Sequence, residues 1–151
     1  RQQRQQKPLQ YAALITEFCR LQISHGDGVA AEELLRKQLS RQWRADWVML
    51  YGQAQGQDAV KQLLTAEKWL KEHAEDPHLL LTLAHICQRS QLWAKARDYY
   101  ETYLKKQKDE VAARELVQLL QALGEHEKAR QWLQKIAAHH TDALPLPLPA
   151  P

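Results

Sequence analysis

A short motif recurs at a fixed distance in the second half of the chain. The triplet Lys-Ala-Arg occupies residues 95–97 and again residues 128–130, so its two copies lie 33 residues apart. In both copies the alanine is followed, four and seven positions later, by large apolar side chains that return to the same face of a helix. A small residue at such a point lets two helices approach closely. The spacing therefore predicts a tandem array of helical hairpins.

A period of 33–34 residues is typical of tetratricopeptide (TPR) repeats, each of which is an antiparallel pair of helices. The composition agrees, since Gly is scarce, Asn is absent, and Ala, Leu, Gln, Glu, Lys and Arg dominate. We expect an all-α, TPR-like α-α superhelix (solenoid) of about four antiparallel helix pairs. The apolar positions expected to pack between helices are Phe18, Cys19, Ala31, Leu35, Ala66, Leu70, Leu80, Leu83, Ala84, Cys87, Ala96, Tyr100, Tyr103, Leu116, Val117, Leu120, Ala129, Leu133 and Ile136.

Aspartate and proline mark the expected helix starts. Asp58, Asp109 and the pair Asp76-Pro77 are predicted to cap helices that follow them. The second hairpin, with helices expected at residues 47–55 and 58–71, fits the repeat only with about two extra residues in its middle. We divide the chain into a polar lead-in (1–8), the repeat domain (9–140) and a proline-rich tail (141–151). The tail is expected to be disordered, with a ligand for a proline-binding module as the alternative.

Several functional classes are not supported. The net charge of +3 is small and spread along the chain, so we expect no nucleic-acid partner. No phosphate-binding loop and no zinc-protease, Cys-x-x-Cys or Gly-x-Ser-x-Gly motif is present. We therefore predict no enzymatic activity, no catalytic residues and no metal site, and read His139-His140 as a fraying helix end. Cys19 and Cys87 are expected to be buried free thiols, as suits a reducing compartment.

The concave face of such a stack, lined by the first helix of each pair, is the usual binding surface. The predicted partner-binding groove contains Arg20, Gln53, His78, His85, Arg89, Arg114 and Gln118. Its arginines suit an acidic or extended peptide, and the alternative is a set of solvated helix faces. A carboxylate clamp of the usual Lys and Asn type is excluded because the chain has no Asn. Trp43 and Trp47 are candidate interface aromatics, whereas Trp69, Trp93 and Trp132 are expected in the core.

Residues 51–132 carry a more particular pattern. It comprises TAEKWLKEH at 65–73, Asp76-Pro77, LLLTLA at 79–84, QLWAKARDY at 91–99 and LGE at 123–125. This stretch resembles the C-terminal half of the bacterial HemY family. The resemblance implies a non-enzymatic inner-membrane protein in which two N-terminal membrane spans precede TPR-like helices. The chain starts on Arg1 without Met, and we expect it to be the soluble part of that protein, on the cytoplasmic side.

The HemY resemblance also implies a role in the late, protoporphyrin and haem, part of tetrapyrrole biosynthesis. We therefore expect a TPR scaffold that binds protein partners, among them enzymes of late haem synthesis, and that needs no cofactor. Two alternatives stay open, a haem or porphyrin carrier and a TPR module for cell-envelope assembly. His85 and Cys87 are the residues that a haem-binding hypothesis would use, although their spacing places them on different sides of a helix.

Overall fold

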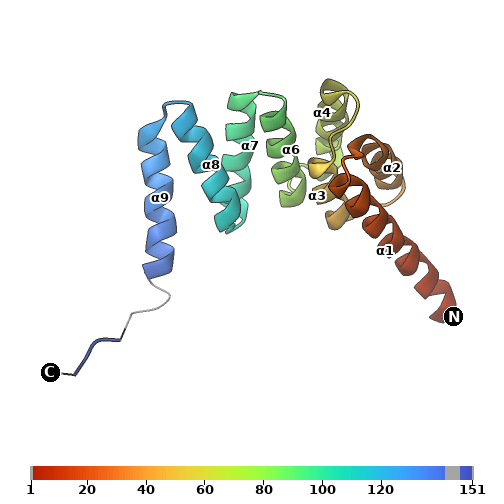
Figure 1. The fold of residues 1–151 in the computed structure, drawn as a ribbon, viewed down its shortest axis with the longest axis horizontal. Helices are drawn as coiled ribbons and strands as arrows, with labels where there is room; N and C mark the ends of the chain where they lie inside the picture. The colour runs from red at the N-terminus through yellow and green to blue at the C-terminus, as the bar shows by residue number, and fades with distance from the viewer. Residues whose placement is uncertain (1, 142–146, 151) are drawn as a thin grey trace.

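A computed structural model describes residues 2–141 and 147–150 of the chain. Within these residues the regular structure is entirely helical. The helices are α1 (Gln2–Ser24), α2 (Gly28–Arg41), α3 (Ala45–Gln53), α4 (Ala59–Lys68), α5 (Leu70–His73), α6 (Pro77–Arg89), α7 (Trp93–Lys106), α8 (Glu110–Ala122) and α9 (His126–Thr141). Figure 1 shows them side by side in a single row, with α1 and α9 at opposite ends.

The helices pair with their neighbours along the chain. α1 packs against α2, α6 against α7, and α8 against α9. The pairs are joined to one another because α2 packs on α3, α4 on α6, and α7 on α8, while α3 also packs on α6. The second pair is looser, since α3 and α4 contact their neighbours α2 and α6 more than they contact each other. This is the hairpin for which the repeat spacing required extra residues.

Helix starts follow the predicted capping chemistry. The carboxylates of Asp58, Asp76 and Asp109 accept hydrogen bonds from backbone N–H groups in the first turns of α4, α6 and α8. Asp27 does the same for α2. These bonds satisfy donors that have no partner inside the helix. The three predicted caps are confirmed.

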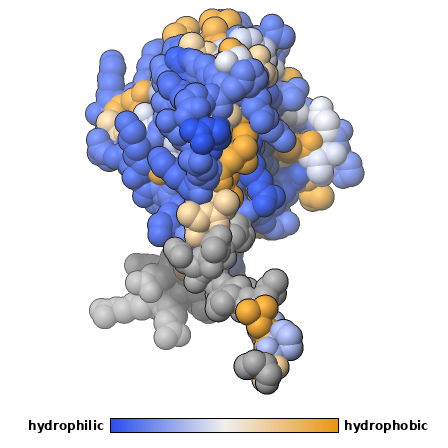
Figure 2. Space-filling view, turned by 90° about the vertical axis from the view of Figure 1, so that its left-hand side faces the viewer, coloured by the Kyte–Doolittle hydropathy of each residue, from blue (hydrophilic) through white to orange (hydrophobic). Residues whose placement is uncertain are grey.

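The core is one continuous cluster of apolar side chains between the paired helices. Most of the predicted packing positions are buried, including the small residues at the close helix contacts, Ala31, Ala66, Ala96 and Ala129. Two predictions are wrong: Phe18 and Leu133 are exposed. Both lie on the outermost helices, α1 and α9, where no further helix of the described chain covers that side. Figure 2 looks onto the α9 end and shows an apolar strip between hydrophilic flanks.

The segments outside the core differ in how far they are described. The polar lead-in belongs to α1, which begins at Gln2 and includes Pro8. Most of the proline-rich tail lies outside the described residues, and residues 147–150 have no regular secondary structure. No helix of the described residues has the length and apolar character needed to cross a membrane.

Candidate functional site

One polar side chain from each first helix occupies the same register position. These residues are Arg20, Gln53, His85 and Gln118, on α1, α3, α6 and α8, at intervals of 32 or 33 residues. Arg20, Gln53 and Gln118 are exposed and His85 is partly exposed. The helices are neighbours, because α1 packs on α3, α3 packs on α6, and His85 bonds to α8. We call these four residues the first-helix row.

The predicted groove arginine Arg89 is already engaged within the fold. Its guanidinium donates hydrogen bonds to the backbone carbonyls of Gly52 and Ala54, at the C-terminal end of α3. These carbonyls have no partner inside the helix, and the positive charge interacts favourably with that end of the helix dipole. Burial lowers the pKa of Arg89. Its role in the structure is to join α6 to α3.

Thr16 and Asp46 form a similar joint between α1 and α3. The Thr16 hydroxyl donates to the Asp46 carboxylate at 3.2 Å, and Trp47 Nε1 donates to Thr16 Oγ1 at 3.0 Å. Arg44 Nε approaches Asp46 at 3.1 Å. Burial opposes the charge on Asp46, but the hydrogen bonds from Arg44 and Thr16 prevail and lower its pKa. This link between the two helices is polar and partly buried.

The two candidate interface tryptophans are used inside the molecule. Trp47 is only 1% exposed, so its interpretation as an exposed contact for a partner is wrong. Trp43 is partly buried, stacks on the ring of His73 with centroids 3.8 Å apart, and donates from Nε1 to Asp76 at 2.7 Å. It therefore fastens the loop before α3 to the start of α6. The opposite error concerns Trp93, expected in the core but 42% exposed at the first turn of α7.

His85 belongs to a hydrogen-bonded network across three helices. Its Nε2 lies 2.8 Å from the Glu115 carboxylate of α8, which also accepts a 2.7 Å bond from the Tyr100 hydroxyl of α7. The same hydroxyl lies 2.8 Å from Gln88 Oε1. Burial, reinforced by the Glu115 charge, raises the pKa of Tyr100, so the phenol stays protonated and can donate. The nitrogen of His85 that faces Glu115 is therefore occupied in this arrangement.

The hydrogen bonds of Glu115 make the free energy of unfolding depend on pH. Hydrogen bonding from His85, against burial and with help from Tyr100, lowers the pKa of Glu115 below its ordinary value. A carboxylate favoured in the folded state stabilises above its unfolded pKa, about 4.3, and loses this contribution as the pH falls through the lower folded pKa. Glu115→Gln should cost about 1–2 kcal/mol of unfolding free energy at neutral pH. The difference from wild type should shrink toward zero below about pH 4.

Urea unfolding of both proteins at neutral and acidic pH measures this difference. His85→Gln removes the main cause of the lowered pKa, so it should give a shallower acid dependence than wild type. Curves for Glu115→Gln and wild type that stay parallel down to acidic pH would contradict the assignment.

The remaining charged or titratable residues of the predicted groove, Arg20, His78 and Arg114, have partners close by in the sequence. Arg20 lies 3.4 Å from Glu17, and Arg114 lies 2.5 Å from Glu110, in both cases on the same exposed helix face. His78 Nδ1 lies 3.2 Å from the capping carboxylate of Asp76. Such surface pairs are weak and exchange readily with other partners.

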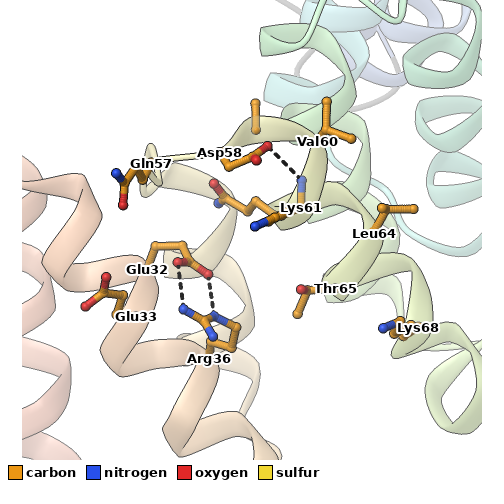
Figure 3. A pocket seen from close by; sticks show the side chains of 12 residues that line it. Glu32, Glu33, Arg36, Gln57, Asp58, Val60, Lys61, Leu64, Thr65 and Lys68 are labelled. Atoms are coloured by element: carbon orange, nitrogen blue, oxygen red, sulfur yellow. Dashed lines mark hydrogen bonds and ion pairs between the residues drawn. The ribbon is translucent and has the colours of Figure 1, made fainter.

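A cleft that the sequence did not predict lies between the second helices α2 and α4. It has a volume of about 910 Å³. Figure 3 shows Glu32 and Arg36 of α2 on the side toward Lys61 and α4, and Glu33 on the other side of α2, at the edge of the cleft. The Glu32 carboxylate already has two partners within the fold. It accepts a 2.6 Å hydrogen bond from the Tyr51 hydroxyl and forms an ion pair with Arg36 at 2.9 Å. The only sequence signal for the cleft is the irregular spacing of the second hairpin.

Both cysteines are buried free thiols, as predicted. Burial raises the pKa of Cys19 and that of Cys87 to about 11, so neither thiol is ionised at neutral pH. An inert, buried thiol of this kind is a packing residue. Among the described residues, no three His, Cys, Asp or Glu side chains are grouped closely enough to hold a metal ion.

No protein-family model matches the chain, and no curated protein sequence gives a significant match.

Proposed function

We propose that this chain is a protein-binding scaffold of the TPR type, which takes an extended segment of a partner along the first-helix row. One observation carries the proposal: Arg20, Gln53, His85 and Gln118 repeat at equivalent positions on four consecutive first helices. A row of hydrogen-bond donors at regular intervals suits the carbonyls and carboxylates of an extended chain. The four helix pairs would then form a right-handed superhelix with this row on its inner face.

The spacing of the row indicates the length of the bound segment. Packed helices lie about 8–10 Å apart, and an extended chain advances about 3.3 Å per residue. Each first helix therefore meets about every third residue of the partner, and four helices read about nine residues. Arg89, being used to join α6 to α3, contributes to the wall of this surface and less to its charge. In this proposal Arg20 and Arg114 give the surface its preference for an acidic partner segment. Each arginine now pairs with a glutamate of its own helix in a solvent-accessible ion pair.

We further propose a parent protein anchored in a bacterial inner membrane and associated with late haem biosynthesis. The support is the resemblance of residues 51–132 to the HemY family, strongest at Leu92-Trp93 and the Lys-Ala-Arg triplet that follows. In this proposal the partners are enzymes of protoporphyrin and haem synthesis, held near the membrane through their extended segments.

Site-specific crosslinking in cells tests both parts of the proposal. A photoreactive amino acid at Gln53 or Gln118 should capture a partner, and mass spectrometry should identify it as an enzyme of late haem synthesis. The same group at Val60, exposed on the cleft side of α4, is the matched control and should capture much less. Capture from Val60 alone would show that the first-helix row is not the binding surface.

The affinity of the captured segment for wild type and for an Arg20 variant measures how much Arg20 contributes to binding. A synthetic peptide of that segment should bind Arg20→Glu about tenfold more weakly than wild type, because an attractive charge becomes repulsive. Lys68→Glu, on the cleft wall, should leave the affinity unchanged. Fluorescence anisotropy measures both constants, and equal affinities for the two variants would reject the role of Arg20.

A further inference from the structure

Three apolar positions of every later first helix are buried, and the same three positions of α1 are not. On α3, α6 and α8 each of these side chains is at most 4% exposed. They are Trp47 and Tyr51, with Ala54 directly after the end of α3; Leu79, Leu83 and Ile86; and Ala112, Leu116 and Leu119. On α1 the equivalents Leu14, Phe18 and Leu21 are 68%, 45% and 57% exposed. Their spacing of four and three residues places them in one stripe along the helix.

The difference follows from which helix precedes each first helix. α2 packs on α3, α4 on α6 and α7 on α8, so every later first helix receives the second helix of the preceding pair. Within the described residues, α1 has no helix before it. By analogy with α3, α6 and α8, the exposed stripe of α1 is the face on which the second helix of another pair would pack.

The other end of the molecule exposes that type of helix. In α2 and α7 the residues four and seven positions after the small alanine are buried, as with Tyr100 and Tyr103. In α9 the corresponding residues are Leu133, 46% exposed, and Ile136, partly exposed. Figure 2 shows an apolar strip on this end of the molecule. The two ends of the molecule thus carry the two complementary faces of one kind of contact, the contact between a second helix and the first helix of the next pair.

We propose that α9 of one copy of this chain packs on α1 of a second copy, head to tail, and repeats the contact between α7 and α8. This surface lies apart from the first-helix row, so the inference goes beyond the proposed function. A contact between unlike ends leaves a free α1 end and a free α9 end on each dimer, so association should continue with rising concentration, into a closed ring or an open filament.

Charged residues at the two ends match as they do inside the chain. Arg97 of α7 pairs at 2.6 Å with Glu125, the residue directly before α9. Arg130 stands 33 residues after Arg97, at the same position of α9, and Asp27 is the residue directly before α2. The head-to-tail joint would bring Arg130 of one copy to Asp27 of the next. Arg130 now pairs with Glu127 of its own helix in an exposed bond that is weak and can exchange.

Sedimentation velocity of three variants tests the joint. Wild type should associate as its concentration rises, whereas Phe18→Glu and Leu133→Glu should each weaken association about tenfold or more, because a charge enters an apolar contact. Mixing these two variants should restore a one-to-one dimer, since one retains an intact α9 end and the other an intact α1 end. Val111→Glu, at a more exposed apolar site on α8 (69% exposed), should associate as wild type does.

Each other result overturns the proposal. If wild type stays monomeric, the head-to-tail contact does not exist. If Leu133→Glu still associates alone, the contact is between two copies of α1. If Phe18→Glu still associates alone, the contact is between two copies of α9 or uses another face. Circular dichroism checks that the variants fold. A charge exchange gives a second test that leaves the apolar stripes intact: Arg130→Glu should weaken association, and mixing it with Asp27→Lys should restore it. Failure to restore it would remove Arg130 and Asp27 from the joint.

Discussion

Replacing Trp47 with alanine is expected to lower the free energy of unfolding by about 3–5 kcal/mol. The indole is 1% exposed, lies between α1 and α3, and donates a hydrogen bond to Thr16. Its removal leaves a cavity and takes away one partner of a buried hydroxyl. Since globular domains are stable by only about 5–15 kcal/mol, this is a large part of the total. Urea unfolding followed by circular dichroism measures the loss.

Trp93 is the matched control for Trp47. It begins α7 and is 42% exposed, so Trp93→Ala should cost less than about 1 kcal/mol. The helix that carries Trp47, α3, packs on α1, α2 and α6, so the Trp47 substitution should release α1 and α2 first. Hydrogen exchange should show faster exchange there than in α8 and α9. Equal costs for the two substitutions would contradict the burial assigned to these tryptophans.

The two tryptophans show where sequence reasoning reaches its limit. Trp47 lies in the irregular hairpin, where the repeat register was uncertain, and this made it look like a surface residue. Trp93 lies beside the clearest motif of the chain, which made it look like a core residue. Periodicity tells which residues share a helix face, but it does not tell these two residues apart, because both lie in the first turn of a helix and only Trp47 is buried. Burial at helix ends is decided by tertiary packing.

The helical character of the chain and the starts of three helices were well predicted, because they depend on local chemistry. Asp58, Asp76 and Asp109 mark helix starts through bonds to residues two or three positions away. Ala96 and Ala129 mark the close helix contacts through their size alone, and both are buried. Signals of this kind act over short distances and can be read without knowing the rest of the fold.

The candidate site was only partly predictable, because a polar residue on the correct face can serve the fold as well as a partner. Arg89 and His85 both lie at groove positions, yet Arg89 caps α3 and His85 bonds to Glu115. Their partners come from other helices, 30 residues or more away in the sequence. Such pairings follow from the packed structure and not from the repeat pattern. What the register does predict is the exposed row to which Arg20, Gln53 and Gln118 belong.

Substituting Gln62 with leucine is expected to cost about 2–4 kcal/mol of unfolding free energy. The Gln62 side chain is buried on the inner face of α4, beside Leu63 and Ala66. Its amide N–H donates to the carbonyls of Tyr51 and Ala54, and its amide oxygen accepts from the N–H of Gly56. It thereby holds the connection between α3 and α4, the two helices of the loosely packed pair. Leucine fills a similar volume but leaves these three backbone groups without that partner.

Hydrogen exchange at residues 53–58, together with urea unfolding, separates this effect from a general loss of packing. Gln62→Leu should speed exchange in that connection more than in α8, because the amide is its main link to α4. Gln57→Leu, on the same connection but exposed, is the matched control and should change stability by less than about 0.5 kcal/mol. If Gln62→Leu cost no more than Gln57→Leu, the hydrogen bonds of this amide would not be what holds the second hairpin closed.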